Sequence, residues 1–259
     1  MCKPYTVVDL FSGVGGFSLG FIDASLENAF ESKLLVDFDK DACFTFRKNY
    51  PDIPFLCQDV SEMTVADVKK HSGISRPDVI IGGPPCQGFS SAGKRAEEDE
   101  RNRLVPIYAQ LAVEMWPKAI LMENVVNVLS SQHFKDLGAK FRECGYETKD
   151  FVLDAADYGV PQHRKRAFLL ALRTTIAKKV GLSAPEPLTT PKVTVKEAIS
   201  DLPSLAAGEG DEYCAYKKGE NITAYQELMR RGSHVIFNHC ARKHSQDFLD
   251  KIAIIPEGG

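Results

Sequence analysis

Thr6-Val7-Val8-Asp9-Leu10-Phe11-Ser12-Gly13-Val14-Gly15-Gly16 is the stretch of the chain that decides its fold. Residues 6–10 form a short apolar and β-branched run around one acid, and they predict a buried strand. The three glycines predict a turn, because glycine adopts positive φ angles and lets a ligand approach the backbone closely. The mixed apolar stretch at 17–24 then predicts a helix.

The same alternation of short apolar runs and helical stretches continues along the chain. Further strands are predicted at 34–36, 55–57, 79–81, 119–122, 147–154 and 167–172, and helices at 39–49, 105–116 and 134–144. This alternation predicts an α/β fold with a doubly wound, mostly parallel sheet. Ligands of such sheets bind outside the carboxyl ends of the strands. We therefore expect one crevice to collect the residues at these ends, which are Asp9, Phe11, Asp37, Asp59, Pro85, Cys86 and Glu123.

Length and composition limit the class of protein. The 259 residues suffice for one α/β domain with a small appendage. No apolar run has the roughly 18 residues that a membrane span needs, and the N-terminus does not resemble a signal peptide, so we expect a cytoplasmic protein, nucleoid-associated if bacterial, with no membrane partner. The seven cysteines show no zinc-site spacing, and no metal is expected.

The charge pattern points to local rather than general contacts with nucleic acid. The formal net charge is −3, whereas generic nucleic-acid-binding domains are strongly basic. Basic residues nevertheless cluster at 163–166, 173–179, 230–231 and 242–243. Such clusters are either solvated surface or a confined binding face.

The glycine-rich turn differs from a dinucleotide-binding motif. Ser18 stands where the third glycine of that motif belongs. The acids Asp9, Asp37 and Asp59 at successive strand ends instead suit a ligand with ribose hydroxyls, an amine and an adenine amino group, as S-adenosylmethionine has. An ordinary strand-to-helix turn is the alternative.

Gly82-Gly83-Pro84-Pro85-Cys86-Gln87 places a thiol directly after two prolines. Proline fixes φ and lacks a backbone donor, so Cys86 is expected to be held stiffly at a strand end. Its polar neighbours are unlike those of a core cysteine, and the segment predicts a reactive thiol; a structural turn is the alternative.

An acid and two arginines complete the candidate chemistry. Glu123 follows the run at 119–122, where a carboxylate is either a helix cap or a proton donor. Arg164 and Arg166 are two residues apart, so in an extended segment they share one face and suit phosphate or carbonyl oxygens, or Glu123 itself.

Taken in order, these four segments resemble the DNA (cytosine-5) methyltransferase family. Asp9 to Gly16 resembles its first cofactor motif, Pro84-Pro85-Cys86-Gln87 its catalytic motif, Glu123-Asn124-Val125 its acid motif and Gln162 to Arg166 its Q-x-R-x-R motif. The resemblance is close over residues 5–173 and looser at 194–203 and 239–259. It implies the Rossmann-like fold of S-adenosylmethionine-dependent methyltransferases and double-stranded DNA as partner, with restriction–modification as the type of system.

The resemblance also implies roles for individual residues. It assigns to S-adenosyl-L-methionine, and to its product S-adenosyl-L-homocysteine, the residues Phe11, Ser12, Gly13, Gly15, Gly16, Asp37, Phe38, Asp59, Val60, Pro85 and Leu104. Cys86 would attack C6 of a flipped cytosine, and Glu123 would hold or protonate N3. Arg166 would bind the O2 carbonyl and Arg164 would steady the catalytic pair.

The rest of the chain carries three further expectations. Residues 87–103 are polar and aperiodic and suit a loop that closes on the flipped nucleotide. Residues 1–173 are predicted to form the cofactor-binding catalytic domain, and 174–259 a connecting segment with the start of a second, target-recognition domain. Because the family's later segments are not visible, either the sequence is truncated or a second polypeptide carries the recognition region.

Three other functions remain open at this point. A tRNA cytosine-5 methyltransferase would share the fold and the cysteine, although that branch tends to read Cys-Gln-Pro-Phe-Thr where this chain reads Cys86-Gln87-Gly88-Phe89-Ser90. A non-catalytic module would not need Cys86, Glu123 and Arg166 together. A nicotinamide or flavin dehydrogenase would rest on the glycine-rich turn alone.

Overall fold

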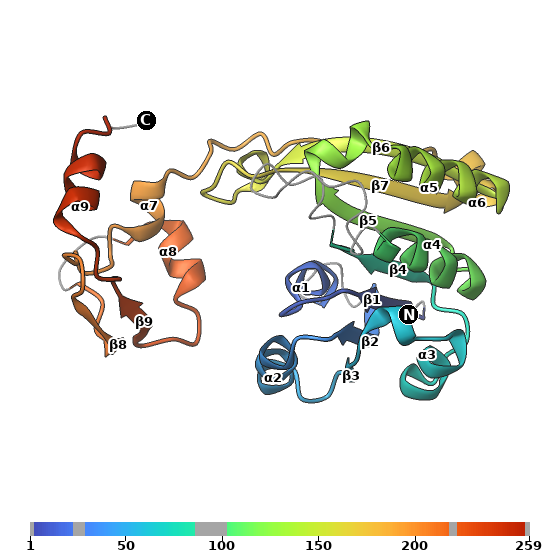
Figure 1. The fold of residues 1–259 in the computed structure, drawn as a ribbon, viewed down its shortest axis with the longest axis horizontal. Coiled ribbons are helices and arrows are strands. Elements are labelled where there is room, and N and C mark those ends of the chain that lie inside the picture. Colours follow the sequence, from blue (N-terminus) through green and yellow to red (C-terminus); the bar gives the residue numbers. More distant parts are fainter. Residues whose placement is uncertain (1–2, 23–28, 86–102, 218–221, 257–259) are drawn as a thin grey trace. The chain divides into compact units, whose positions relative to one another are not determined.

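The computed structural model describes residues 3–22, 29–85, 103–217 and 222–256 (Figure 1). The chain divides into two compact units. The first comprises Met1–Asp154 and Lys165–Glu186, and the second comprises Ala155–Arg164 and Pro187–Gly259. Each unit is described separately below.

The first unit is built on a seven-stranded sheet with the order β3-β2-β1-β4-β5-β7-β6. Its strands are β1 (Tyr5–Leu10), β2 (Phe30–Asp37), β3 (Phe55–Cys57), β4 (Val79–Gly82), β5 (Ala119–Val125), β6 (Tyr146–Asp154) and β7 (Lys165–Arg173). The first five strands are parallel, whereas β7 runs antiparallel between β5 and β6. The strand order reverses between β1 and β4, which is where ligands bind in open α/β sheets.

Helices cover both faces of this sheet. They are α1 (Gly16–Ile22), α2 (Lys40–Asn49), α3 (Val65–Ser72), α4 (Leu104–Met115), α5 (Gln132–Glu143) and α6 (Thr174–Val180). Successive residues of a strand face opposite sides, so Leu34 and Val36 join the main core with α3, α4 and α5, while Leu35 packs against Phe46 of α2. The apolar alternation of the sequence thus becomes two cores around one sheet.

The predicted α/β fold with a doubly wound, mostly parallel sheet is confirmed. The strand predicted at 55–57 has the observed bounds, and the other predicted strands and helices are found with shifted ends. The helices α3 and α6 were not predicted. Since α6 packs on β6 and β7, the first unit extends past residue 173, where the sequence placed the domain boundary, to Glu186.

The second unit has short elements and a polar interior. Its elements are α7 (Val195–Ile199), β8 (Gly210–Cys214), α8 (Ala224–Met229), β9 (Ile236–Cys240) and α9 (Gln246–Ala253). The strands β8 and β9 pair antiparallel. In the described part of the chain beyond residue 186, the buried residues are Asp201 and Gln226. Beyond residue 186, the described part of the chain therefore has no buried apolar core.

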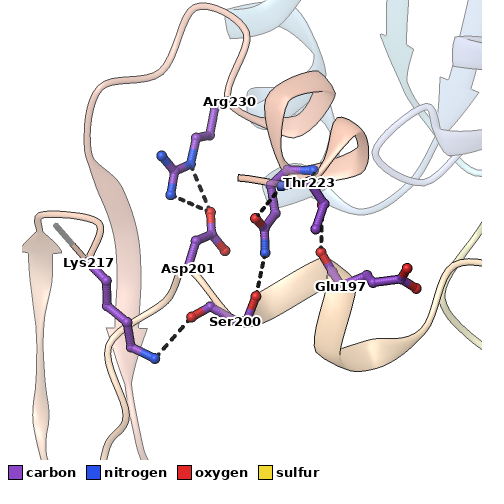
Figure 2. Close-up of polar contacts among 7 residues, drawn as sticks. Glu197, Ser200, Asp201, Lys217, Thr223 and Arg230 are labelled. Carbon is purple, nitrogen blue, oxygen red and sulfur yellow. Dashed lines mark hydrogen bonds and ion pairs between the residues drawn. The ribbon is translucent and has the colours of Figure 1, made fainter. Parts of the chain in front are cut away.

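A network of polar contacts joins α7 to α8 (Figure 2). Arg230 donates from Nε to Asp201 Oδ2 over 2.8 Å, and its Nη2 lies 2.6 Å from the same oxygen. The Arg230 guanidinium also lies over the Tyr216 ring. Gln226 Nε2 donates to Ser200 Oγ over 2.9 Å. These contacts replace apolar packing as the link between the two helices.

No helix in the described ranges is long and apolar enough to cross a membrane.

Candidate active site

The carboxyl ends of β1 and β2 are tied together by Asp37. Its Oδ2 accepts from the Gly13 backbone N–H over 2.7 Å, and its Oδ1 accepts from the Asp39 backbone N–H over 2.9 Å. Asp37 is buried, with 9% of its surface exposed. A carboxylate oxygen has more than one lone pair, so Asp37 keeps capacity to accept from ribose hydroxyls at the edge of the sheet.

The glycine-rich turn has the conformation that the glycines predict. Phe11, Gly13 and Gly15 have φ angles of 63°, 54° and 86°. A Cβ atom on Gly15 would lie 2.4 Å from the Phe46 ring, so this position requires glycine for space as well as for φ. At Gly13 no heavy atom in the described part of the chain lies within 4 Å of such a Cβ position. This position therefore requires glycine for its positive φ and not for space. The turn is therefore a rigid backbone support beside Asp37.

The other predicted cofactor residues differ in how much surface they offer. Phe38 is 69% exposed directly after β2, as a ring that stacks on adenine should be. Asp59 is exposed and accepts from the Ser61 backbone N–H over 2.8 Å. Val60 is buried in the main core and offers almost no side-chain surface.

The remaining predicted cofactor residues lie at the same edge or beside it. Ser12 is buried, and its backbone N–H donates to the Val36 carbonyl over 3.0 Å. Gly16 begins α1, Pro85 follows β4, and Leu104 begins α4. Pro85 and Leu104 are half-buried.

Asp9 does not face a ligand as its place in the sequence suggested. Only 1% of its surface is exposed, and its Oδ2 accepts from Ser18 Oγ over 2.6 Å. Burial raises the pKa of Asp9 to about 7, and the nearby Asp37 carboxylate adds to that rise, while the Ser18 hydrogen bond opposes it. The central strand β1 is covered on both faces, so this acid points into the protein.

Glu123 and Arg166 form an ion pair at the end of β5. Arg166 Nε lies 3.0 Å from Glu123 Oε1, and both side chains are about one quarter exposed, at 24% and 29% for Arg166 and Glu123. The antiparallel register sets Val125 opposite Arg166, so Arg166 lies diagonally across from Glu123. The pair is fixed by the sheet and still open to a ligand.

Asn124 links the end of β5 to the proline turn. Its Nδ2 donates to the Pro84 carbonyl over 2.9 Å in a buried hydrogen bond, and its Oδ1 accepts from the Val125 backbone N–H. A Cβ on Gly83 would lie 3.4 Å from Glu123 Oε2, which shows how near this turn passes to the carboxylate. The sequence places Asn124 in the acid motif and assigns it no role; its position directly after Glu123, at the end of the apolar run 119–122, was the available signal.

Two predicted residues stand outside this geometry. Cys86 lies outside the described residues, as does the predicted closing loop up to residue 102. Arg164 belongs to the second unit, so its predicted support of Glu123 stays a prediction. The described site thus consists of the sheet edge around Asp37 and an acid–arginine pair beside the proline turn.

Comparison with known proteins identifies the family of the chain. The model of the C-5 cytosine-specific DNA methylase family matches residues 5–251, and the chain belongs to that family.

Named relatives agree with the assignment. The chain is 37% identical to Type II methyltransferase M.DdeI of Desulfomicrobium norvegicum over 97% of this chain and 61% of that relative. It is 33% identical to Type II methyltransferase M.AquIA of a Picosynechococcus species over 76% of this chain and 88% of that relative. A crystal structure of a prophage-encoded E. coli protein of the DNA modification methyltransferase type matches with a TM-score of 0.77 and 27% identity, over 97% of this chain and 75% of that one. The chain thus spans about three fifths of M.DdeI.

Proposed function

We propose that this chain is the catalytic and cofactor-binding part of a DNA (cytosine-5) methyltransferase of restriction–modification type. It would transfer a methyl group from S-adenosyl-L-methionine to C5 of a cytosine flipped out of duplex DNA. The observation that carries this proposal is the Arg166–Glu123 ion pair beside Pro84, two residues before the only thiol in the catalytic motif. Family membership and the Type II relatives support it.

The described residues fit S-adenosyl-L-methionine. Gly13 is half-buried with open space around its Cβ position, so it leaves the backbone accessible at the point where the sheet order reverses. The buried Asp37 carboxylate suits ribose hydroxyls, the exposed Phe38 ring suits the adenine face, and exposed Asp59 suits the adenine amino group. When bound, the cofactor supplies a methyl group on a positively charged sulfonium.

The protein residues would activate the cytosine ring. The Cys86 thiolate attacks C6, forming a carbon–sulfur bond and moving electron density toward C5. Glu123 protonates or holds N3, and the Arg166 guanidinium bonds the O2 carbonyl, so the charge that develops on the ring is shared by two fixed groups. C5 then takes the methyl group, and loss of its proton expels Cys86 and restores the aromatic ring.

The substrate must leave the base stack before Cys86 reaches it. Flipping a cytosine costs a few kcal/mol. Contacts with the phosphates and with the base left unpaired in the other strand must offset this cost. We assign this work to the polar residues 87–103, including Lys94, Arg95 and Arg103, as the sequence predicts.

A recognition region is needed for a defined target sequence. M.DdeI extends well beyond the matched stretch, whereas M.AquIA is matched over 88% of its own length. We propose that the recognition region either follows this sequence in the same polypeptide or comes from a second polypeptide, and that the combined protein acts on duplex DNA.

A mechanism-based adduct tests the proposal. The chain, with the recognition region restored, is incubated with S-adenosyl-L-methionine and duplex DNA that contains 5-fluorocytosine. Because C5 carries fluorine in place of hydrogen, it has no proton to lose and the last step is blocked. A covalent protein–DNA adduct should therefore accumulate and resist denaturation. The Cys86→Ala variant should form none, and an adduct on that variant would overturn the assignment of the nucleophile.

Substrate choice needs a separate comparison. Labelled methyl groups from the cofactor should enter duplex DNA and not tRNA when both are offered to the same preparation. Labelling of tRNA alone would overturn the DNA assignment while leaving the cytosine-5 chemistry intact. Binding of S-adenosyl-L-homocysteine but not of NAD, measured by calorimetry, separates both from a dehydrogenase.

A further inference from the structure

Two free thiols lie against the backbone that carries the proposed cofactor residues. Cys43 Sγ donates to the Asp37 carbonyl over 3.5 Å, and Cys57 Sγ donates to the Phe38 carbonyl over 3.8 Å. Cys43 comes from α2 and Cys57 from the end of β3. Burial raises the pKa of Cys43 to about 12, and the nearby Cys57 thiol adds to that rise. The two thiols are neighbours, since they bond to the carbonyls of consecutive residues and line one pocket.

The pair is open to small molecules from one side. A pocket of about 700 Å³ is lined by Lys40, Cys43, Phe44, Arg47, Lys48 and Cys57. Cys57 is half-buried, whereas only 2% of Cys43 is exposed. A reagent in the pocket therefore meets Cys57 first, and the three cations favour a reagent that carries negative charge.

We propose that Cys43 and Cys57 form a dithiol site that a small anionic disulfide converts to an intramolecular disulfide, and that this cross-link weakens cofactor binding at Asp37 and Phe38. The second part rests on the proposed function, whereas the cross-link itself does not. Neither thiol takes part in the methyl-transfer chemistry.

The oxidation proceeds by two thiol–disulfide exchanges. The Cys57 thiolate attacks one sulfur of the small disulfide, forms a mixed disulfide and releases one small thiolate. The Cys43 thiolate then attacks the Cys57 sulfur and releases the second. Two protons leave the protein thiols, and the two electrons reduce the small disulfide to two thiols, so the reaction balances.

The state of the thiols sets the rates and the stability of the product. Because the pKa of Cys43 is raised, its thiolate is scarce and the second exchange is the slow one. For the same reason the reverse reaction must release a poor leaving group, which favours a disulfide that resists reduction. A mixed disulfide on Cys57 should therefore be seen early and then decline.

The cross-link would act on the cofactor edge through the 37–38 backbone. Both thiol hydrogen bonds to the Asp37 and Phe38 carbonyls are lost when the hydrogens leave. The Asp37 side chain accepts a hydrogen bond from the Gly13 backbone N–H over 2.7 Å. A shift of the 37–38 backbone therefore also shifts the glycine-rich turn. Ribose and adenine contacts would then be disturbed together.

Peptide mapping tests the cross-link. The reduced chain is treated with glutathione disulfide at pH 8, alkylated and digested with trypsin, which separates residue 43 from residue 57 at Arg47 and Lys48. The two peptides should become joined, with a mass two hydrogens below their sum. The Cys43→Ala variant should stop at the glutathione adduct on Cys57. Peptides that stay unjoined in the wild type would overturn the site.

Calorimetry with S-adenosyl-L-homocysteine tests the effect on the cofactor. The Kd of the oxidised chain should be at least about tenfold weaker than that of the reduced chain, and reduction should restore it. The Cys57→Ser variant should lose this response, while Cys240→Ser, which changes an exposed cysteine of the second unit, should keep it. Equal affinities before and after cross-linking would overturn the regulatory part. Failure of the reduced chain to bind would instead count against the proposed function.

Discussion

Arg166 Nε lies 3.0 Å from Glu123 Oε1, on neighbouring antiparallel strands of one sheet. The register places these residues on a diagonal, so neither side chain has to stretch to reach the other. A guanidinium keeps its charge at every relevant pH and presents several donors. Arg166 can therefore hold Glu123 with one donor and still offer others to a substrate oxygen.

The Glu123→Gln variant should lose methyl transfer with little loss of cofactor binding. An amide cannot transfer a proton to N3 or form an ion pair with Arg166, so kcat is expected to fall by about 10² to 10⁴, the usual range for a lost acid–base group. Steady-state kinetics and calorimetry check this. Glu147→Gln, on the exposed side of β6, should keep wild-type kcat. Full activity in the Glu123 variant would exclude the proposed role.

Asn124→Ala should loosen the turn that precedes Cys86. The substitution removes a buried hydrogen bond and leaves the Pro84 carbonyl unpaired, which costs about 1–3 kcal/mol. We expect a lower Tm and a slower formation of the 5-fluorocytosine adduct. The matched control is Asn49→Ala, which removes an exposed amide bonded to Thr45. Unchanged adduct kinetics in a folded Asn124 variant would rule out positioning by this residue.

Gly15→Ala should destabilise the first unit. The new Cβ overlaps the Phe46 ring, and the alanine must adopt a φ of 86°. The two effects together cost about 3 kcal/mol. Gly20→Ala, in α1 with open space around its Cβ position, should be neutral or stabilise by up to about 1 kcal/mol. Urea unfolding measures both variants, and equal midpoints would contradict the packing described.

Asp9 should make stability fall as pH rises from about 4 to about 7. Its pKa is about 7 in the folded chain, whereas the ordinary value for an aspartate is 3.8, so between these values the folded state binds more protons than the unfolded state. The Asp9→Asn variant lacks this titration and should gain stability relative to the wild type over that range, with no further gain above it. Urea unfolding at several pH values checks this, with exposed Asp52→Asn as control. A difference that does not vary with pH would refute it.

Breaking the Asp201–Arg230 pair should unfold the second unit locally. Removal of the arginine leaves the buried Asp201 carboxylate unpaired, at a cost of about 3–5 kcal/mol, so Arg230→Met should speed amide hydrogen exchange in α7 and α8. The exposed Asp247–Lys251 pair offers the comparison, since Asp247→Asn should cost less than about 1 kcal/mol. The double variant Asp201→Leu with Arg230→Met should recover much of the protection. Equal exchange in both single variants would contradict the argument.

The sheet was predictable because its strands carry strong local signals. Apolar runs at 79–81 and 119–122 end in glycine, proline or acid, and each one is a strand of the observed sheet. The hydrophilic helix α3 was missed, because it buries only Val68 and begins with a capping box at Thr64 that adds little apolar periodicity. The strands β8 and β9 are mostly exposed and show no apolar alternation to read.

The positions of the site residues along the strands could be predicted from the sequence, whereas the contacts between their side chains could not. Asp37 and Phe38 lie at the expected edge, because every parallel strand contributes its carboxyl end there. The burial of Asp9 depends on its contact with Ser18 and on the elements that pack on both faces of β1. No local sequence pattern reveals either of these. The contact of Arg166 with Glu123 depends on the register of β5 and β7, and that register is set by the whole sheet.

The Asn124–Pro84 hydrogen bond joins residues 40 positions apart, and the Asp37–Gly13 bond joins residues 24 positions apart. Arg166 reaches Glu123 only after β7 has inserted between β5 and β6. Contacts of such long sequence separation form slowly, since each must close a loop first. During synthesis on the ribosome, therefore, the cofactor edge can assemble before β7 has emerged, but the acid–arginine pair cannot. A growing chain would acquire its proposed cofactor site first and its proposed catalytic pair last.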